Sequence, residues 1–368
     1  MTLTVAVGED QATMTELLVG TKKGLFVYEG EAGSELRLTA RAFAGDPVEY
    51  AMRDAGSGRL LASVTSPFYG PKIWLADDPA GEWSQAEGVA LPEGGDEALV
   101  RVWTIVAGEA EGLVYAGGDP GVLFESRDGG ASWELNAALW EHPTRPSWQP
   151  GGGGLCLHSI VPWPGDPDRL ALAVSAAGVW LSEDGGATWS RGNEGLVPRY
   201  VPEESRAEST DLCVHSLQRA ARRPERIFMQ FHGGVYRSDD AGRTWNDVAA
   251  GLPSDFAFPL AVDPADPDSA FVIPLTAETD RVAAGGRMQV YETRDAGASW
   301  TARGEGLPQQ DAYLTVLRHA FGAAGQGPQL ELYFGTTSGH VFGSADAANT
   351  WFAVADCLPT VHSVVAVR

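Results

Sequence analysis

The sequence predicts an all-β fold, a seven-bladed β-propeller made of four-stranded blades. Three observations support this prediction. An eight-residue phrase recurs along the chain, two strand-like runs precede its copies, and the first part of the chain supplies strands that the last unit lacks. We therefore expect residues 1–368 to form a single domain, with residues 1–13 as a flexible N-terminal extension.

The recurring phrase reads S/T-x-D-x-G-x-T/S-W. It begins at Ser126, Ser182, Ser238 and Thr293, and a degenerate copy begins at Ser344. Asp-Gly and Gly-Gly favour tight hairpin turns because they tolerate positive φ angles. The phrase therefore predicts the turn between the third and fourth strands of a blade, C and D. Its Asp accepts hydrogen bonds from the turn, and its Trp covers the hairpin.

Two apolar runs precede the phrase in a unit, and the first of them predicts strand A, the innermost strand of the blade. In one unit the runs for strands A and B are HSIVPW (158–163) and RLALAV (169–174). The seven A strands are predicted to begin near Val48, Val102, Leu157, Val214, Ala257, Leu314 and Val361. No further strand follows the last one, but residues 15–30 align with the B–C pair at 330–345, and residues 36–42 can form strand D. Both termini then close the last blade and leave no open sheet edge.

Composition excludes several classes of partner. Lys and Arg number 26 and Asp and Glu number 49, which gives a formal charge of −23. Such a surface repels the phosphates of nucleic acids and anionic membranes, so we expect neither as a partner. The sequence has no apolar run of membrane-spanning length, no cationic leader and three cysteines, and we expect a cytoplasmic protein without disulfides. The oligomeric state stays open.

Aligning the seven A strands places one residue of each blade on a ring at the mouth of the central channel. These residues are Glu49, Trp103, His158, His215, Phe258, Thr315 and His362. His232, at the B–C turn of the fourth blade, adds another imidazole on the same face. Converging imidazoles suit Zn, Cu, Fe or Ni, so we predict that His158, His215, His232 and His362 bind a divalent transition metal. The alternative is repeat ancestry, in which each imidazole bonds to neighbouring backbone.

Other candidates belong to the same face, where the D–A and B–C loops lie. The loops at 136–154, 196–211 and 276–288 are long, and insertions on one face of a repeat fold often bind ligands. We predict catalytic roles for Glu49 and Arg145, and substrate binding by Trp103, Trp148, Arg281 and Arg318, with a small anionic or sugar-like molecule as substrate. Cys156 and Cys213 share a strand face with His158 and His215, although a buried apolar role suits both thiols.

The phrase resembles the Asp-box, or BNR repeat, of sialidases, sortilin-type receptors and bacterial glycosidase-like propellers. The segments GTKKGLFV, GGGGLCLHSI, GVYRSDDAG and TVLRHA are similar to bacterial seven-bladed proteins labelled glycosyl hydrolase or exo-sialidase. This resemblance implies the propeller fold, not a particular reaction. Sialidases are typically six-bladed and carry an Arg-Ile-Pro strand, which this chain lacks.

Three functions follow from these patterns. The first is a metal-dependent enzyme that acts on a small molecule at the channel mouth. The second is a glycoside hydrolase or lyase, which requires two carboxyl groups about 5–9 Å apart; Glu49, Glu141 and Asp211 are the candidates. The third is a non-catalytic scaffold for a protein or small ligand, in which the ring histidines bond only to protein.

Overall fold

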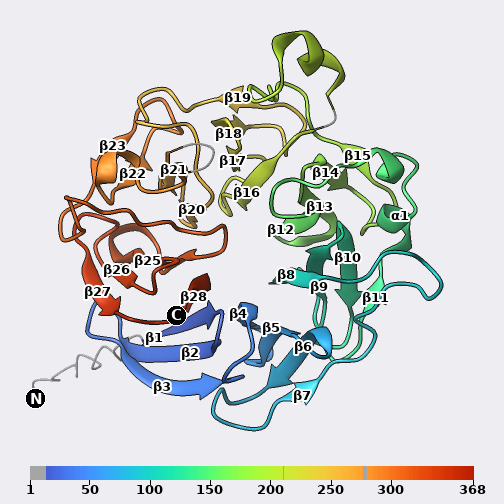
Figure 1. Ribbon diagram of the computed structural model, residues 1–368, viewed down its shortest axis with the longest axis horizontal. Helices are drawn as coiled ribbons and strands as arrows, with labels where there is room; N and C mark the ends of the chain where they lie inside the picture. Colours follow the sequence, from blue (N-terminus) through green and yellow to red (C-terminus); the bar gives the residue numbers. More distant parts are fainter. Residues whose placement is uncertain (1–13, 210, 277–279) are drawn as a thin grey trace, which may run out of the picture.

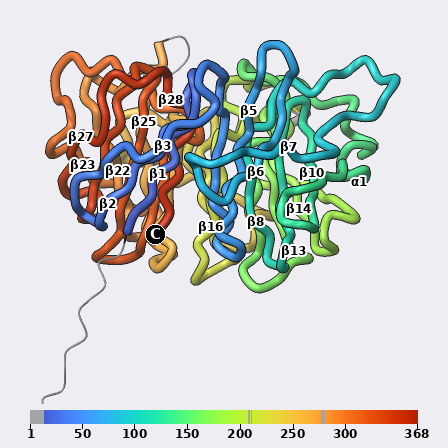
Figure 2. The backbone as a smooth tube through the Cα atoms, turned by 90° about the horizontal axis from the view of Figure 1, so that it is seen from below, coloured from blue at the N-terminus to red at the C-terminus, as the bar shows by residue number. Residues whose placement is uncertain are grey.

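The structure, a computed structural model, describes residues 14–209, 211–276 and 280–368 (Figure 1). The expected extension at 1–13 lies outside these described residues. Seven four-stranded antiparallel sheets stand around a common axis, so the predicted seven-bladed propeller is confirmed. Seen from the side, the blades form a ring with loops on both faces (Figure 2).

Each blade runs outward from strand A at the channel to strand D at the rim. The first contains β4 (Val48–Arg53), β5 (Leu60–Ser66), β6 (Gly70–Ala76) and β7 (Ser84–Gln85). The second contains β8 (Arg101–Ala107), β9 (Val114–Asp119), β10 (Val122–Ser126) and β11 (Glu134–Leu135). The third contains β12 (Cys156–Trp163), β13 (Asp166–Ser175), β14 (Gly178–Ser182) and β15 (Ser190–Arg191). The fourth contains β16 (Val214–Arg219), β17 (Ile227–Phe231), β18 (Gly234–Ser238) and β19 (Asn246–Asp247).

The remaining three blades follow the same order. The fifth contains β20 (Leu260–Asp263), β21 (Asp266–Val272), β22 (Val290–Thr293) and β23 (Thr301–Arg303). The sixth contains β24 (Phe321–Ala324), β25 (Glu331–Gly335), β26 (Val341–Ser344) and β27 (Phe352–Ala355). The seventh joins β28 (Val361–Val367) to β1 (Met14–Thr21), β2 (Gly24–Glu31) and β3 (Arg37–Ala42). In the described residues, helical structure is confined to α1 (Ala137–Trp140) and to short 3-10 turns at Arg145–Ser147, Glu203–Glu208, Ala284–Gly286 and Gly327–Gln329.

The last blade is closed as predicted, because β28 is the innermost strand of a sheet whose other strands come from the N-terminal part. Val364 pairs with Val19 and Val365 with Leu18 across this junction. Val19 and Val364 are both buried and belong to the large cluster that joins the fifth, sixth and seventh blades. The closure therefore consists of backbone pairing and continuous apolar packing.

Two A strands begin later than the sequence suggested. β20 begins at Leu260 instead of Ala257, and β24 begins at Phe321 instead of Leu314. The Leu314 carbonyl accepts a hydrogen bond from the Ala283 amide at 2.8 Å. Leu314 therefore pairs with the B–C segment of the fifth blade, and strand A of the sixth blade begins only at Phe321. As a result Thr315 does not take the predicted ring position.

Each recurring phrase closes its predicted turn. In SDDAGRTW the Asp240 carboxylate accepts hydrogen bonds from Ser238 Oγ at 2.8 Å and from the Thr244 amide and hydroxyl at 2.9 and 2.7 Å. The indole of Trp245 donates to the Gly192 carbonyl of the preceding blade at 2.8 Å. The phrase thus fastens its own turn and also ties neighbouring blades together.

Replacing Asp240 with Ala is expected to lower the free energy of unfolding by about 1–3 kcal/mol, because several donors lose an ionised acceptor. Burial raises the pKa of Asp240, but hydrogen bonds from Thr244 and Ser238 outweigh burial and hold that pKa below its ordinary value. A group with a lowered pKa stabilises the fold above its unfolded pKa of about 3.9, and this contribution is lost as the pH falls through the folded value.

Urea unfolding of the wild type and of Asp240→Ala at pH 7 and near pH 3 measures both effects. The difference between the two proteins should shrink at the lower pH. Asp240→Asn, which keeps one acceptor oxygen, should be intermediate at pH 7. Equal stability of all three proteins at pH 7 would contradict the fastening role.

Candidate functional site

In five A strands the pairing with strand B shifts register at the residue predicted to lie on the ring. The residues left out of the pairing with strand B are Glu49, Trp103, His158, His215 and His362. Such a β-bulge bends the strand and redirects the side chain of the extra residue. The repeated bulge explains why four of these residues, Glu49, Trp103, His215 and His362, line the same end of the channel although they are far apart in the sequence.

A cavity of about 260 Å³ lies at this end of the channel. The predicted site residues in its lining are Glu49, Trp103, His215, His232, Arg281, Arg318 and His362. Arg101, Gly152, Gly153, Cys213, Phe258, Leu317 and His319 complete the lining. Gly152 comes from a D–A loop and Arg281 from a B–C segment, so both kinds of loop meet at the mouth.

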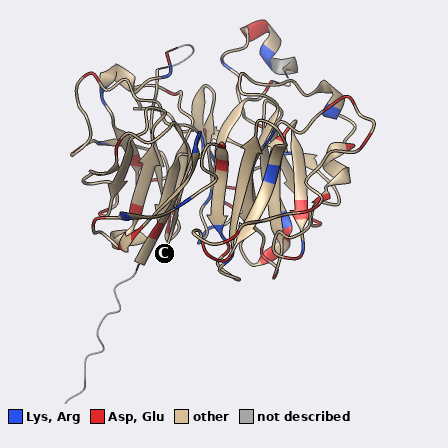
Figure 3. Ribbon diagram, turned by 60° about the horizontal axis from the view of Figure 1, so that its bottom comes forward, with Lys and Arg blue, Asp and Glu red and all other residues tan. Residues whose placement is uncertain are grey.

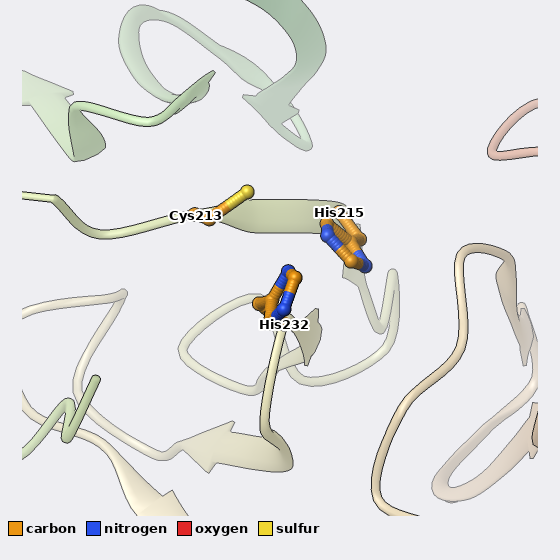
Figure 4. Close-up of side chains that lie close together, drawn as sticks. All are labelled: Cys213, His215 and His232. Carbon is orange, nitrogen blue, oxygen red and sulfur yellow. The ribbon is translucent and has the colours of Figure 1, made fainter. Parts of the chain in front are cut away.

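Three side chains of the fourth blade form a group that can hold a metal ion (Figure 4). The ligand atoms of Cys213, His215 and His232 all lie within 4.8 Å of one another. Cys213 directly precedes β16, His215 lies within β16, and His232 follows β17, where its amide donates to the Cys213 carbonyl at 3.0 Å. Pairing of β16 with β17 therefore brings the three donors together.

The donor set fits a first-row transition metal. Around a tetrahedral ion with bonds of about 2.0–2.3 Å, ligand atoms stand roughly 3.5 Å apart, so rotations that move side-chain ends by about 1 Å complete the geometry. The Nδ1 of His215 lies 2.6 Å from the Ala257 carbonyl oxygen. Because that contact requires a proton on Nδ1, Nε2 carries the lone pair, as in most metal-bound histidines. The residues present therefore suit a metal.

Neighbouring groups support these three side chains. The Cys213 thiol lies 3.1 Å from Ser175 Oγ, and burial raises the pKa of that thiol. Tyr200, from the long loop at 196–211, packs its ring against His232 with centroids 4.5 Å apart. The Tyr200 hydroxyl also accepts a hydrogen bond from the Cys213 amide at 2.8 Å. This loop thus positions two of the three donors.

The structure does not bring His158 into this group. Its ring is fully buried, with Nε2 2.9 Å from the Val214 carbonyl oxygen and Nδ1 2.9 Å from Ser159 Oγ. Burial and the positive charge of Arg318 lower the pKa of His158 well below its ordinary value, so the ring is neutral at pH 7. His158 joins the third blade to the fourth, which matches the backbone-bonded alternative.

Glu49 and His362 form a second polar group on the cavity wall. Their Oε2 and Nδ1 atoms are 3.1 Å apart, and Arg101 Nη1 lies 3.7 Å from the same carboxylate. Burial raises the pKa of Glu49, but the neighbouring His362 imidazole and the charge of Arg101 outweigh it, so the pKa lies below its ordinary value. Glu49 is therefore ionised and orients the partly exposed imidazole of His362.

Arg318 and His319 separate this cavity from another at the opposite end of the channel. Both residues also line that second cavity, of about 370 Å³, together with Tyr50, Gln218 and Arg219. The His319 ring packs against Tyr50 with centroids 5.3 Å apart. Burial, together with the charge of Arg318, lowers the pKa of His319 to about 3, so its ring is neutral.

Besides His158, two predicted residues lie outside the cavity lining, namely Arg145 and Trp148. Arg145 pairs with Glu97 at 2.9 Å, donates to the Pro120 carbonyl, and stacks over Trp140 at 3.7 Å from the ring centroid. Trp148 is buried in the apolar cluster between the second and third blades. Both side chains hold the long loop at 136–154 onto the blades and do not face the cavity.

The glycine run at 151–154 lies at the mouth of the cavity, where neighbouring side chains leave no space for a Cβ atom at Gly151 or Gly154. A Cβ atom at Gly154, where φ is +103°, would lie 2.2 Å from Asp119 Oδ2. A Cβ atom at Gly151 would lie 2.9 Å from Ser175 Oγ. Close approach of this loop to the second blade at Asp119 and to the third blade at Ser175 therefore favours glycine.

The sequence interpretation did not include Cys213 among the predicted metal ligands or His319 among the cavity residues. Cys156-Leu-His158 and Cys213-Val-His215 share the motif Cys-x-His. The two blades differ in the residue at the B–C turn. Aligning GVW (178–180) with GVY (234–236) places Ala176 where the fourth blade has His232. This comparison of turns would have identified the fourth blade as the one with three donors.

The chain matches no protein-family model and no curated protein sequence. Many solved structures share its fold. A putative 6-phosphogluconolactonase of Bacteroides fragilis superposes with a TM-score of 0.58 and 9% identity, over 98% of this chain and 99% of that chain. YCF48 bound to a D1 peptide gives a TM-score of 0.53 and 14% identity, over 88% and 87% of the two chains.

An ancestral GH74 enzyme gives a TM-score of 0.55 and 15% identity over 96% of this chain, which spans 40% of that enzyme's length. At these identities the similarity establishes the propeller fold alone, and the related structures include both enzymes and a peptide complex. In the described residues, no helix is long and apolar enough to cross a membrane.

Proposed function

We propose that the protein is a metal-dependent enzyme that acts on a small molecule in the channel-mouth cavity. Cys213, His215 and His232 hold the metal, and a thiolate with two imidazoles favours Zn²⁺ among the divalent ions considered, Zn, Cu, Fe and Ni. We also infer, from the phrase and its hydrogen bonds, that the chain is an Asp-box propeller. The observation that carries the metal proposal is the convergence of three donors within 4.8 Å beside the cavity.

The remaining residues define what the site can do. Three protein donors leave a coordination position open, and a bound ion would there polarise a substrate oxygen or acidify a water molecule. The Glu49 carboxylate holds the imidazole of His362 at 3.1 Å, so His362 can accept or deliver a proton within the cavity. Trp103 and Phe258 supply apolar walls.

The geometry gives less support to a glycosidase. That reaction needs two carboxyl groups facing one substrate. Among the described residues, Glu49 is the sole carboxylate in the cavity lining, and Glu141 and Asp211 lie outside it. A non-catalytic scaffold is the second alternative, and metal analysis separates it from the proposal.

Metal content of the untagged full chain, purified without chelators, tests the proposal. We expect about one transition-metal ion per chain, as three-donor sites in enzymes hold. Loading with Co²⁺ should give a thiolate-to-metal absorption band that Cys213→Ser removes. Cys156→Ser is the matched control and should keep the band. A chain that contains no metal and ignores micromolar Zn²⁺, Co²⁺, Cu²⁺, Fe²⁺ and Ni²⁺ would refute the proposal.

A further inference from the structure

Arg318 carries a positive charge in the channel without a carboxylate partner. Among the described residues, no ion pair within 4.0 Å joins its guanidinium to an Asp or Glu oxygen, although the chain has 49 acidic residues. In Figure 3 the Asp and Glu positions are spread over the blades and loops. Its Nη2 donates to Ser175 Oγ over a long 3.4 Å, and its Nε is buried without a hydrogen-bond partner. Holding a partly buried charge without an anionic partner is costly, and a bound anion would compensate it.

A second buried donor in the same lining also lacks an acceptor. The indole Nε1 of Trp103 has no hydrogen-bond partner. The ring of Trp103 lies 5.6 Å from the Arg318 guanidinium carbon, and Phe258 lies at the same distance. Guanidinium and indole N–H groups can only donate, so the missing partner of both is an acceptor.

The surroundings of Arg318 favour a charged acceptor. Arg281 and Arg101 also line the cavity, and the Glu49 carboxylate is engaged by His362 and Arg101. A Cβ atom at Gly153 would stand 3.5 Å from Arg318 Nη1, so a side chain there would contact the guanidinium from the side of the mouth. The forked N–H groups of a guanidinium match the two oxygens of a carboxylate or phosphate.

We propose that the cavity is a binding site for a small organic anion whose carboxylate or phosphate group is held by Arg318, with Arg281 at the rim. This inference rests on the proposed function in one respect, since the remainder of the anion would extend toward Cys213, His215 and His232. The volume of about 260 Å³ restricts the ligand to a small molecule. The substrate class is therefore small carboxylates or phosphate esters, not polysaccharides.

Calorimetric titration of the full chain with succinate and, separately, with inorganic phosphate at constant ionic strength tests this site. We expect at least one of these anions to bind the wild type, and Arg318→Met to weaken that binding by roughly tenfold or more. Arg318→Lys, which keeps the charge without the fork, should be intermediate. The preferred probe distinguishes a carboxylate from a phosphate site.

Arg243→Met is the matched control, because Arg243 is exposed and pairs with Glu183 at the rim of the propeller. Its anion binding should equal that of the wild type. Arg318→Met should unfold at the same or a higher temperature, since it removes an unpaired, partly buried charge. Failure of the wild type to bind either anion at 10 mM would overturn the inference, as would unchanged binding by Arg318→Met.

Metal content of the same samples keeps the two proposals apart. Arg318-dependent anion binding by a chain without metal would support the anion site and refute the metal-dependent function. Stoichiometric metal in a chain that binds neither anion would give the reverse result. In Arg318→Met we expect metal content to be unchanged, because Arg318 is not among the three donors.

Discussion

Replacing His215 with Ala is expected to lower metal affinity by at least about 100-fold, and the same result is expected for His232→Ala. Even changes in the groups that orient ligands reduce metal affinity about 10–100-fold, so loss of one of three ligands should cost more. His215 is also pre-positioned by its contact with the Ala257 carbonyl, which leaves Nε2 available. Competition with a chromophoric chelator measures the affinity of each variant.

Two further variants decide between the sequence prediction and the structure. His158→Gln should retain the metal, because both ring nitrogens of His158 already contact protein groups. His340→Ala should also retain it, since that imidazole is 39% exposed and lies 4.0 Å from Asp356, away from the cavity lining. Loss of metal in His158→Gln with retention in His232→Ala would show that the ligands are those of the ring and not those of the fourth blade.

Replacing Val364 with Asp is expected to destabilise the fold by more than about 4 kcal/mol, or to prevent cooperative folding. The side chain is 1% exposed and lies in the strand that closes the ring, so the variant would bury an unpaired carboxylate between blades. Val364→Ala, which removes methyl groups without adding charge, should cost about 1–2 kcal/mol. Thermal unfolding followed by circular dichroism measures both.

A surface change just beyond the end of the same strand provides the control. Arg368 is exposed just beyond β28, and Arg368→Asp should change stability by no more than about 0.5 kcal/mol. If Val364→Asp unfolded at the wild-type temperature, the junction between β28 and β1 would not be holding the ring closed.

The architecture could be predicted because its signals are local and repeated. The turn phrase combines Asp, Gly and Trp at fixed positions, and each residue has a physical role that does not depend on distant parts of the chain. The closing strand was predicted by counting the strands of each blade. No strand follows VHSVVAVR in the sequence to complete its blade, and no strand A precedes the B–C pair at 15–30. Both inferences used pattern alone, and the paired strands agree with them.

The candidate site was harder to predict because it depends on register. The ring register was correct in five blades, each with a bulge at the predicted residue, and four of these residues line the cavity at the mouth. In the sixth blade LTVL (314–317) suggested a strand, whereas the strand that forms is FGAA (321–324), whose Gly and Ala residues have weak β propensity. Tertiary hydrogen bonding at Leu314 decided the outcome, and Arg318 and His319 entered the channel as a consequence.

His158 and His215 lie in the same sequence motif, yet the motif does not predict which of them faces the cavity. Both histidines follow a Cys two positions earlier and precede a Ser. One is enclosed between blades and the other opens onto the cavity, and the difference depends on the residues that pack across from each strand. Sequence spacing carries no information about those contacts.

All three proposed metal donors reside in one blade, although the cavity they border is built by many. The three proposed donors fall within about twenty consecutive residues, Cys213 to His232, and are supported from neighbouring blades by Ser175 and by the Ala257 carbonyl. Duplication or exchange of a single repeat could install or delete such a centre while the rest of the ring continued to shape the ligand. Designers could likewise transplant the fourth blade, together with the contacts from Ser175 and the Ala257 carbonyl, into an inert propeller and vary reactivity and recognition separately.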